Sequence, residues 1–306
     1  MRKILIVGSN GLLGQKISKL FSLSKMYKLL NASIENESYV DNIDYTQLDV
    51  TNRKNVLGIV EDFEPEVIIN TAAVTNVDYC ETNKEIAWRV NVKGVENLIY
   101  AAKFVDAKII HFSSDYVFDG RKGSYVETDV PNPVSYYGRT KLASENVLKL
   151  SGLNYTIIRT MILYGVGKNV KDNFAIWVYK NLKENKIINV VDDQFGNPTL
   201  VDDLAYAVMR VVEYNRDGLY HIAGSEIVSR YNFALQIANQ FGFDKKLIIP
   251  IKTAVLKQPA PRPLKSGFVT LKAVSELGIK MSNVEDGVRI FAAQLQNYLN
   301  EQKSNQ

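Results

Sequence analysis

The first fourteen residues constrain the fold more than any other part of the chain. Residues 3–7 form a continuous aliphatic run, which is typical of a parallel strand buried on both faces. Three glycines with the spacing G-x-x-G-x-x-G follow at once, namely Gly8, Gly11 and Gly14. A strand, a glycine turn and a helix start predict a dinucleotide site in an α/β fold, because a diphosphate must approach backbone N–H groups more closely than a Cβ atom permits.

Strand and helix patterns alternate through the first half of the chain. Strand-like runs lie at 3–7, 27–30, 45–48, 67–70, 108–112 and 155–159. Helical periodicity covers 12–22, 53–63, 84–105 and 137–150. This alternation predicts a doubly wound parallel (Rossmann) sheet with right-handed crossovers.

Turn signals become denser after residue 159, which indicates a second, smaller part of the chain. Helices are predicted at 202–214, 229–241 and 284–301. We therefore expect an NAD(P)-binding Rossmann domain over 1–165, to which 192–215 returns. Segments 166–191 and 216–306 are expected to form a smaller α/β substrate lobe at the C-terminal side.

Tyr137 and Lys141 are four residues apart in a predicted helix, so both side chains lie on one helix face. A neighbouring ammonium favours the phenolate, so Lys141 is expected to lower the pKa of Tyr137 toward the range useful for proton transfer. Ser114 follows a predicted strand, as do residues 8–14 and 70–75. Ligands bind at the carboxyl ends of such strands, so these segments are expected to share one crevice.

The composition is that of an ordinary globular protein. Hydrophobic residues make up 46% of the 306 residues and charged residues 23%, with a net charge of +4 spread along the chain. We expect no nucleic-acid partner, no membrane span and a cytoplasmic location, since Cys80 is the one cysteine and the early apolar run is too short for a signal sequence. We also expect no metal site, with His111 and His221 as core residues and Asp202 as a helix cap.

Several segments of the chain resemble the extended short-chain dehydrogenase/reductase family. They are 70–78, 113–120, 137–141, 159–160, 193–199 and 262–263, in addition to the glycine turn. The resemblance implies that Ser114, Tyr137 and Lys141 are catalytic. It implies a cofactor site that contains Gly8, Asn10, Gly11, Leu12, Leu13, Gly14, Asp49, Val50, Ala72, Ala73 and Val74 as well as Tyr137 and Lys141. It implies a substrate site that contains Thr75, Ser114, Asp115, Asn173, Phe174, Gln194 and Arg262.

The implied reaction is NAD(P)H-dependent reduction of the 4-keto group of a nucleotide-linked 6-deoxysugar. Tyr116 stands where related dehydratases carry a glutamate that assists elimination, which favours reduction. Ile162 replaces the tryptophan of similar reductases, so either the pocket takes a different sugar or Ile162 belongs to the core. Residues 31–33 provide neither an acid for a ribose 2′-hydroxyl nor an arginine for a 2′-phosphate, which tilts the expected cofactor toward NADPH over NADH.

Two other functions are compatible with the resemblance. One is a nucleotide-sugar epimerase, which has a similar set of serine, tyrosine and lysine. The other is a non-catalytic NADP-binding regulatory subunit resembling the β subunit of methionine adenosyltransferase. The sugar and the base stay open at this point, and the resemblance is compatible with a homodimer.

Overall fold

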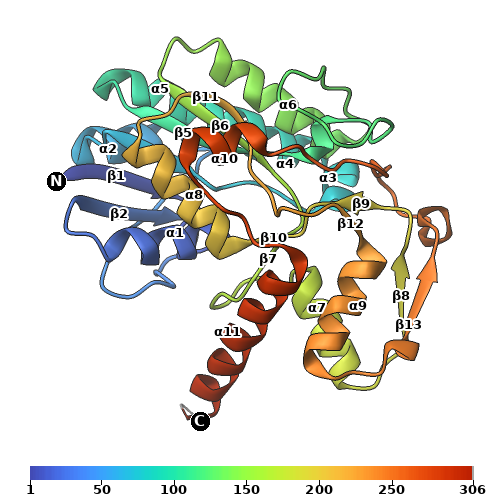
Figure 1. Cartoon of the computed structure of the whole chain (residues 1–306). Helices are drawn as coiled ribbons and strands as arrows, with labels where there is room; N and C mark the ends of the chain where they lie inside the picture. The colour runs from blue at the N-terminus through green and yellow to red at the C-terminus, as the bar shows by residue number, and fades with distance from the viewer. Residues whose placement is uncertain (305–306) are drawn as a thin grey trace.

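A seven-stranded sheet forms the centre of the computed structural model, which describes residues 1–304 (Figure 1). The strand order is β11-β6-β5-β4-β1-β2-β3, and all neighbours are parallel. The strands are β1 (Arg2–Val7), β2 (Tyr27–Ser33), β3 (Asp44–Gln47), β4 (Val67–Asn70), β5 (Lys108–Ser114), β6 (Tyr155–Thr160) and β11 (Gly218–His221). The predicted doubly wound parallel α/β fold is confirmed.

Helices cover both faces of the sheet. One face carries α1 (Leu12–Ser22), α8 (Val201–Glu213) and α10 (Leu271–Leu277), and the other carries α2 (Arg53–Phe63), α5 (Gly94–Val105) and α6 (Tyr136–Lys149). Side chains alternate between the faces along β1. Ile4 and Ile6 pack with α1 and α8, whereas Leu5 and Val7 pack with α2 and α5. Burial on both faces explains why the strand is aliphatic throughout.

The segment predicted as one helix over 84–105 is interrupted. It consists of α4 (Lys84–Trp88), a π-helical turn η1 (Arg89–Lys93) and α5, and the short helix α3 (Val77–Thr82) precedes them. Asn91 lies in the π turn, where its side chain accepts a hydrogen bond from Val74 N at 2.8 Å and donates one to Val74 O at 3.0 Å. The extra residue of a π turn thus places this amide against the loop that follows β4.

A second part of the molecule packs beside the sheet at the carboxyl ends of its strands. Tyr164, Phe233 and Phe291 are central in its core. Its helices are α7 (Phe174–Lys183), α9 (Arg230–Phe241) and α11 (Val284–Ser304), and Figure 1 shows them grouped on one side of the sheet layer. Its strand pairs are β7 (Leu163–Tyr164) with β10 (Thr199–Leu200), β9 (Phe195–Gly196) with β12 (Val228–Ser229), and β8 (Ile188–Val191) with β13 (Ile248–Ile251). Short 3-10 turns are η2 (Asp115–Val117), η3 (Lys245–Leu247) and η4 (Thr253–Leu256).

Two details differ from the sequence-based predictions. β11 and α10 lie within 216–306, which was expected to belong entirely to the substrate lobe, yet β11 pairs with β6 and α10 packs into the core of the sheet layer. Asp202 does not cap α8, because Leu200 holds the cap position and the Asp202 carboxylate accepts from Lys16 Nζ at 2.9 Å. The acidic side chain therefore ties α8 to α1.

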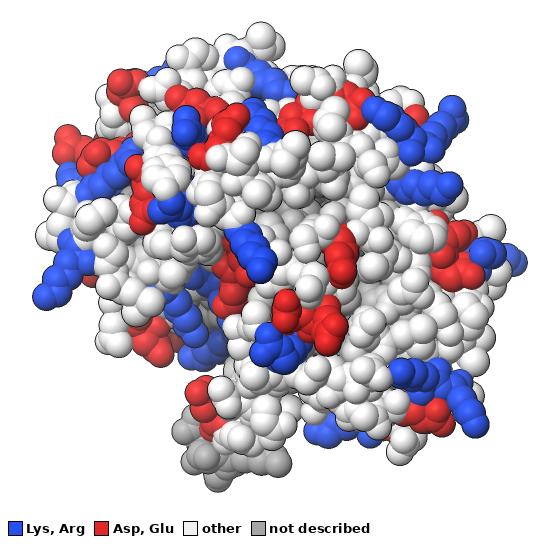
Figure 2. All heavy atoms as spheres, viewed as in Figure 1, with Lys and Arg blue, Asp and Glu red and all other residues white. Residues whose placement is uncertain are grey.

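Basic and acidic side chains are interspersed on the face shown in Figure 2. Within residues 1–304, no helix combines the length and the apolar character needed to cross a membrane.

Candidate active site

The turn between β1 and α1 forms a narrow backbone cradle. Gly8 has φ +78°, and a Cβ atom there would lie 2.6 Å from the backbone nitrogen of Ala72. A Cβ atom on Gly14 would collide with the carbonyl oxygen of Gly8. The Thr71 hydroxyl donates to the carbonyl oxygens of Val7 and Gly8, each at 2.9 Å, which fixes the end of β4 against the turn. The chain therefore fits the diphosphate of a dinucleotide, which needs such a close backbone approach.

Two cavities open at the carboxyl ends of the strands and share part of their floor. The larger has a volume of about 490 Å³, and the smaller about 320 Å³. Of the predicted site residues, the larger contains Gly11, Leu12, Leu13, Ala72, Ala73, Thr75, Ser114, Asp115, Tyr137 and Lys141. The smaller contains Gly8, Gly11, Asp49, Val50, Ala72, Ala73 and Val74. Gly11, Ala72 and Ala73 belong to both, so a molecule as long as a dinucleotide can extend from one into the other.

The predicted catalytic side chains come from β5 and α6. Ser114 is the last residue of β5, and Tyr137 and Lys141 lie in the first two turns of α6. Ser135 caps α6 by accepting from Gly138 N at 3.2 Å. A Cβ atom on Gly138 would collide with the carbonyl oxygen of Tyr116, so the glycine lets α6 close onto the segment after β5. The helix start thus faces the end of the neighbouring strand.

The pKa of Tyr137 differs from the predicted one. Burial first, and then the nearby Asp115 carboxylate, raise the pKa of Tyr137 well above its usual range, although a hydrogen bond with Ser114 opposes this. The expected lowering by Lys141 is wrong for this structure, because desolvation dominates. Burial lowers the pKa of Lys141 to about 8, against the opposing charge of Glu145. Tyr137 therefore holds its proton at neutral pH.

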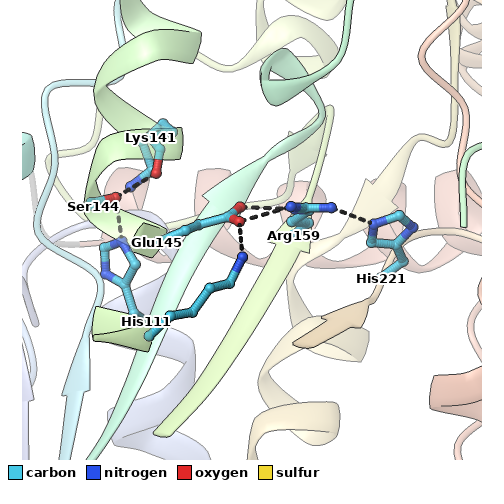
Figure 3. A network of polar contacts seen from close by, with 7 residues as sticks. His111, Lys141, Ser144, Glu145, Arg159 and His221 are labelled. Carbon is cyan, nitrogen blue, oxygen red and sulfur yellow. Dashed lines mark hydrogen bonds and ion pairs between the residues drawn. The ribbon is translucent and has the colours of Figure 1, made fainter. Parts of the chain in front are cut away.

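A buried ion pair supports α6 from behind (Figure 3). Glu145 accepts from Arg159 Nε at 2.8 Å and from Arg159 Nη2 at 2.7 Å, and neither side chain is more than 1% exposed. Arg159 Nη1 lies 3.3 Å from His221 Nε2, and Lys149 Nζ lies 3.1 Å from Glu145. The bidentate contact connects α6, one turn beyond Lys141, to the end of β6.

Both histidines lie in the core. His111 contacts the Ser144 hydroxyl at 2.9 Å, and His221 stacks on Phe268 at 4.0 Å between ring centroids. Burial lowers the pKa of His221 to about 3, with the Arg159 charge as the second cause. Among the described residues, no group of three or more His, Cys, Asp or Glu side chains is placed to hold a metal ion.

Some predicted substrate residues lie outside the larger cavity. Asn173 caps α7 by accepting from Ile176 N, and its amide donates to Gly165 O at 2.8 Å. Gln194 donates to the Thr253 hydroxyl at 3.1 Å. The lining of this cavity includes neither these two residues nor Phe174 and Arg262. Their contacts with substrate stay predictions.

Asn10 and Gly14 line neither cavity, so their contacts with a cofactor stay predictions. Asn10 is buried and organises the loop after β2: its amide donates to Glu37 O at 2.8 Å and to the Glu35 carboxylate at 3.2 Å. Ser33 donates to the same carboxylate at 2.6 Å. Glu35 therefore brings an acid to the smaller cavity, two residues beyond the triplet on which the tilt toward NADPH was based.

The sequence did not identify two residues that line the cavities, Glu35 and Arg230, nor Asn91, which supports the loop after β4. Glu35 lies two residues beyond the 31–33 segment in which a ribose-binding acid was expected, and the π turn that contains Asn91 has no recognised sequence pattern. Arg230 lines the larger cavity from α9, far along the chain from the other lining residues. Ile162 also lines it and has φ +46°, a strained conformation for a β-branched residue and one that often marks functional sites.

The fold and the site define an oxidoreductase of the extended short-chain dehydrogenase/reductase class, as the sequence motifs indicated. The chain belongs to the family described as RmlD substrate binding domain, whose model matches residues 1–297.

Known relatives agree with this membership. A dTDP-4-dehydrorhamnose reductase of Aggregatibacter actinomycetemcomitans is 35% identical over 305 residues, which cover 96% of this chain and 99% of the relative. A crystal structure of dTDP-4-dehydrorhamnose reductase from Bacillus anthracis in complex with NADP is 29% identical, with a TM-score of 0.83, and covers 96% of this chain and 99% of that one. Methionine adenosyltransferase 2 subunit beta of Bos taurus is 30% identical and covers 82% of this chain and 75% of the relative.

Proposed function

We propose that this protein reduces the 4-keto group of a dTDP-linked 6-deoxysugar, with NADPH or NADH as the reductant. The observation that carries the proposal is the placement of Ser114, Tyr137 and Lys141 in one cavity that continues into the glycine cradle. The substrate and cofactor named for the reductase relatives support the choice of nucleotide sugar and of nicotinamide.

A reduced nicotinamide, when bound, supplies the hydride that the carbonyl carbon receives. The remaining work belongs to side chains of the protein. The Ser114 hydroxyl, which donates to Asp115 at 2.9 Å in the free protein, exchanges this bond for one that orients the carbonyl oxygen of the substrate. The Tyr137 phenol donates its proton to that oxygen as negative charge develops. The Lys141 ammonium lines the same cavity as Tyr137, and its positive charge stabilises the phenolate left after transfer.

The direct test is a spectrophotometric assay of NADPH and NADH consumption with dTDP-4-dehydrorhamnose, followed by mass spectrometry of the sugar nucleotide. The expected product is heavier than the substrate by two hydrogens. Changing Tyr137 to Phe keeps the ring and removes the acid, so kcat should fall about 10²- to 10⁴-fold. Equal turnover by the two enzymes would contradict the role of Tyr137.

The non-catalytic alternative is favoured by the similarity to methionine adenosyltransferase 2 subunit beta. A regulatory subunit would bind NADP without consuming NADPH in the presence of the sugar nucleotide. An epimerase would interconvert sugar nucleotides with no net consumption of cofactor. The same assay therefore separates the three functions.

We also propose where the ligands and the protein reside. The sheet layer holds the dinucleotide, and the part around α7, α9 and α11 holds the nucleotide sugar. A cytoplasmic location is supported by the buried, unpaired Cys80 and by the biosynthetic substrate of the reductase relatives. A homodimer is proposed from the family resemblance, and light scattering of the purified protein tests it.

A further inference from the structure

One cation in the larger cavity has no role in the mechanism described above. Of the described residues that line this cavity, Lys141 and Arg230 are the basic ones. Lys141 serves Tyr137, whereas Arg230 approaches from the other part of the molecule as the first residue of α9. Ser229 precedes it as the helix cap, and Arg230 N donates to Gln194 O at 3.0 Å. The backbone at this position is thus firmly held.

The Arg230 side chain lacks an acceptor. Within residues 1–304, no hydrogen bond or ion pair joins its guanidinium to another residue. Arg262 differs, because its Nη2 lies 2.8 Å from Asp78 Oδ2 and its Nη1 donates to Ala260 O at 2.9 Å. Arg230 is half-buried, and a guanidinium carries five N–H donors whose partial burial without acceptors is costly. Such a group is suited to an anionic ligand.

The surroundings orient Arg230 without neutralising it. Its guanidinium carbon lies 5.2 Å from the centre of the Phe174 ring, within the range of a cation–π contact. Asp115 is the nearby carboxylate, but both of its oxygens already accept hydrogen bonds, from Ser114 at 2.9 Å and from Ser266 at 2.6 Å. Phe174, expected to contact the substrate, thus contributes by supporting the arginine.

We propose that Arg230 binds the diphosphate of the nucleotide sugar. This inference rests on the proposed function, and it identifies Arg230 as the positively charged residue that pairs with the substrate diphosphate. A sugar placed at Ser114 and Tyr137 leaves its diphosphate to extend toward the α9 side of the same cavity, where the Arg230 donors are free. The planar fork of arginine matches two phosphate oxygens at once. Arg262, which the family resemblance placed in the substrate site, is held by Asp78 instead.

The test measures the binding of dTDP and of thymidine by titration calorimetry and saturation-transfer NMR on the full-length protein. The Arg230→Gln variant should bind dTDP about 10- to 100-fold more weakly, because a charged hydrogen-bond donor is lost. Its affinity for thymidine, which has no phosphate, should not change. Arg230→Lys keeps the charge and loses the fork, so its loss should be smaller. Arg289→Gln is the matched control, since Arg289 is an exposed arginine of α11 paired with Asp286.

Each outcome decides the assignment. Wild-type affinity for dTDP in Arg230→Gln would overturn the role of Arg230 and leave the proposed reduction standing. Equal losses for dTDP and thymidine would also overturn it, because Arg230 would then shape the pocket and not hold phosphate. A wild-type protein that binds no dTDP would refute both proposals. The thermal midpoint of unfolding and the affinity for NADP⁺ show whether each variant is folded. If Arg230→Gln lowers either of them, the dTDP affinity of Arg230→Lys decides whether Arg230 binds the diphosphate.

Discussion

At the scale of single residues, Lys141 sets the predicted pH dependence. Burial lowers the pKa of its ammonium to about 8, so the positive charge is present below that pH and is lost above it. The charge stabilises the Tyr137 phenolate, so kcat/KM should fall as the pH rises through about 8. The pH profile of kcat/KM, which reports groups of the free enzyme, checks this expectation. In the Lys141→Arg variant the side chain stays charged at alkaline pH. The pH profile of its remaining kcat/KM should therefore have no alkaline limb.

An alkaline limb that stays near pH 8 in the arginine variant would assign the titration to another group. Tyr137 is not a candidate for that group, because burial and Asp115 raise its pKa far above this range. Cys80 is buried next to Tyr137, and burial raises the pKa of its thiol to about 11. Of Cys80, Tyr137 and Lys141, we therefore expect Lys141 to set the alkaline limb.

Glu35 should discriminate between the two nicotinamide cofactors. Its carboxylate is fixed by Ser33 and Asn10 in the smaller cavity, where an acid accepts from a ribose 2′-hydroxyl and repels a 2′-phosphate. The Glu35→Gln variant should raise the ratio of NADPH to NADH efficiency about 10-fold or more, by the energy of one charged hydrogen bond. Dissociation constants for NADP⁺ and NAD⁺, measured by calorimetry, should change in the same direction.

Glu37 provides the control for that experiment. It is an exposed acid of the same loop that takes part through its backbone carbonyl, which accepts from Asn10. Its change to Gln should leave the cofactor ratio unaltered. If both variants shift the ratio equally, the effect comes from the net charge of the loop, and Glu35 has no specific contact with the ribose.

At the scale of elements, the Glu145–Arg159 pair connects α6 to β6 and should be a major source of stability. Removing one partner of a buried ion pair costs about 3–5 kcal/mol, because the other charge stays buried and unpaired. Glu145→Gln should therefore lower the free energy of unfolding by about 3 kcal/mol in urea titrations. Lys149→Gln removes a more exposed partner of the same carboxylate, and the expected loss is below about 1 kcal/mol. Equal effects of the two substitutions would contradict this account.

The sign of the pH dependence follows from the same contacts. Burial raises the pKa of Glu145, but the hydrogen bonds and charge of Arg159 outweigh it, so the pKa is lower than in the unfolded chain. The stabilisation is present above the unfolded pKa of about 4.3 and is lost as the pH falls through the lower folded value. Acid should therefore reduce the difference in stability between the wild-type protein and Glu145→Gln.

The elements were the part of the structure that the sequence predicted best. The glycine turn and the aliphatic runs define β1, α1 and β4 because those patterns reflect local sterics and burial on both faces. The π turn at Asn91 could not be predicted, since it depends on contacts with Val74. The same holds for Arg230, which reaches the cavity through tertiary packing. Local patterns thus located the Ser114, Tyr137 and Lys141 side of the site, and distant contacts supply the other side.

At the scale of the whole molecule, the core of the sheet layer contains segments from distant parts of the chain. This arrangement limits where the chain can be cut into parts that fold alone. Four side chains of α8, Val201, Leu204, Val208 and Val211, are fully buried in the cluster that also contains the apolar face of α1. Each contributes about 1.5–3 kcal/mol on burial, so together they provide roughly 6–12 kcal/mol. That sum is comparable with the entire stability of a typical domain, about 5–15 kcal/mol. The Rossmann part therefore depends on segments that follow the first substrate-lobe helix.

A fragment of residues 1–165 should consequently fail to fold, although it contains the glycine turn and all three predicted catalytic residues. It lacks α8, β11 and α10, so the face of the sheet layer that α8 and α10 share with α1 would keep α1 as its one remaining cover. Near-UV circular dichroism and urea titration should show no cooperative transition for the fragment, whereas the full chain should show one. A cooperative transition of the fragment, together with binding of NADP⁺, would mean that α1 and the strands form a sufficient core alone. In the expected case the two parts form one folding unit, because the chain leaves the sheet layer after β6 and returns to complete it with α8 and β11.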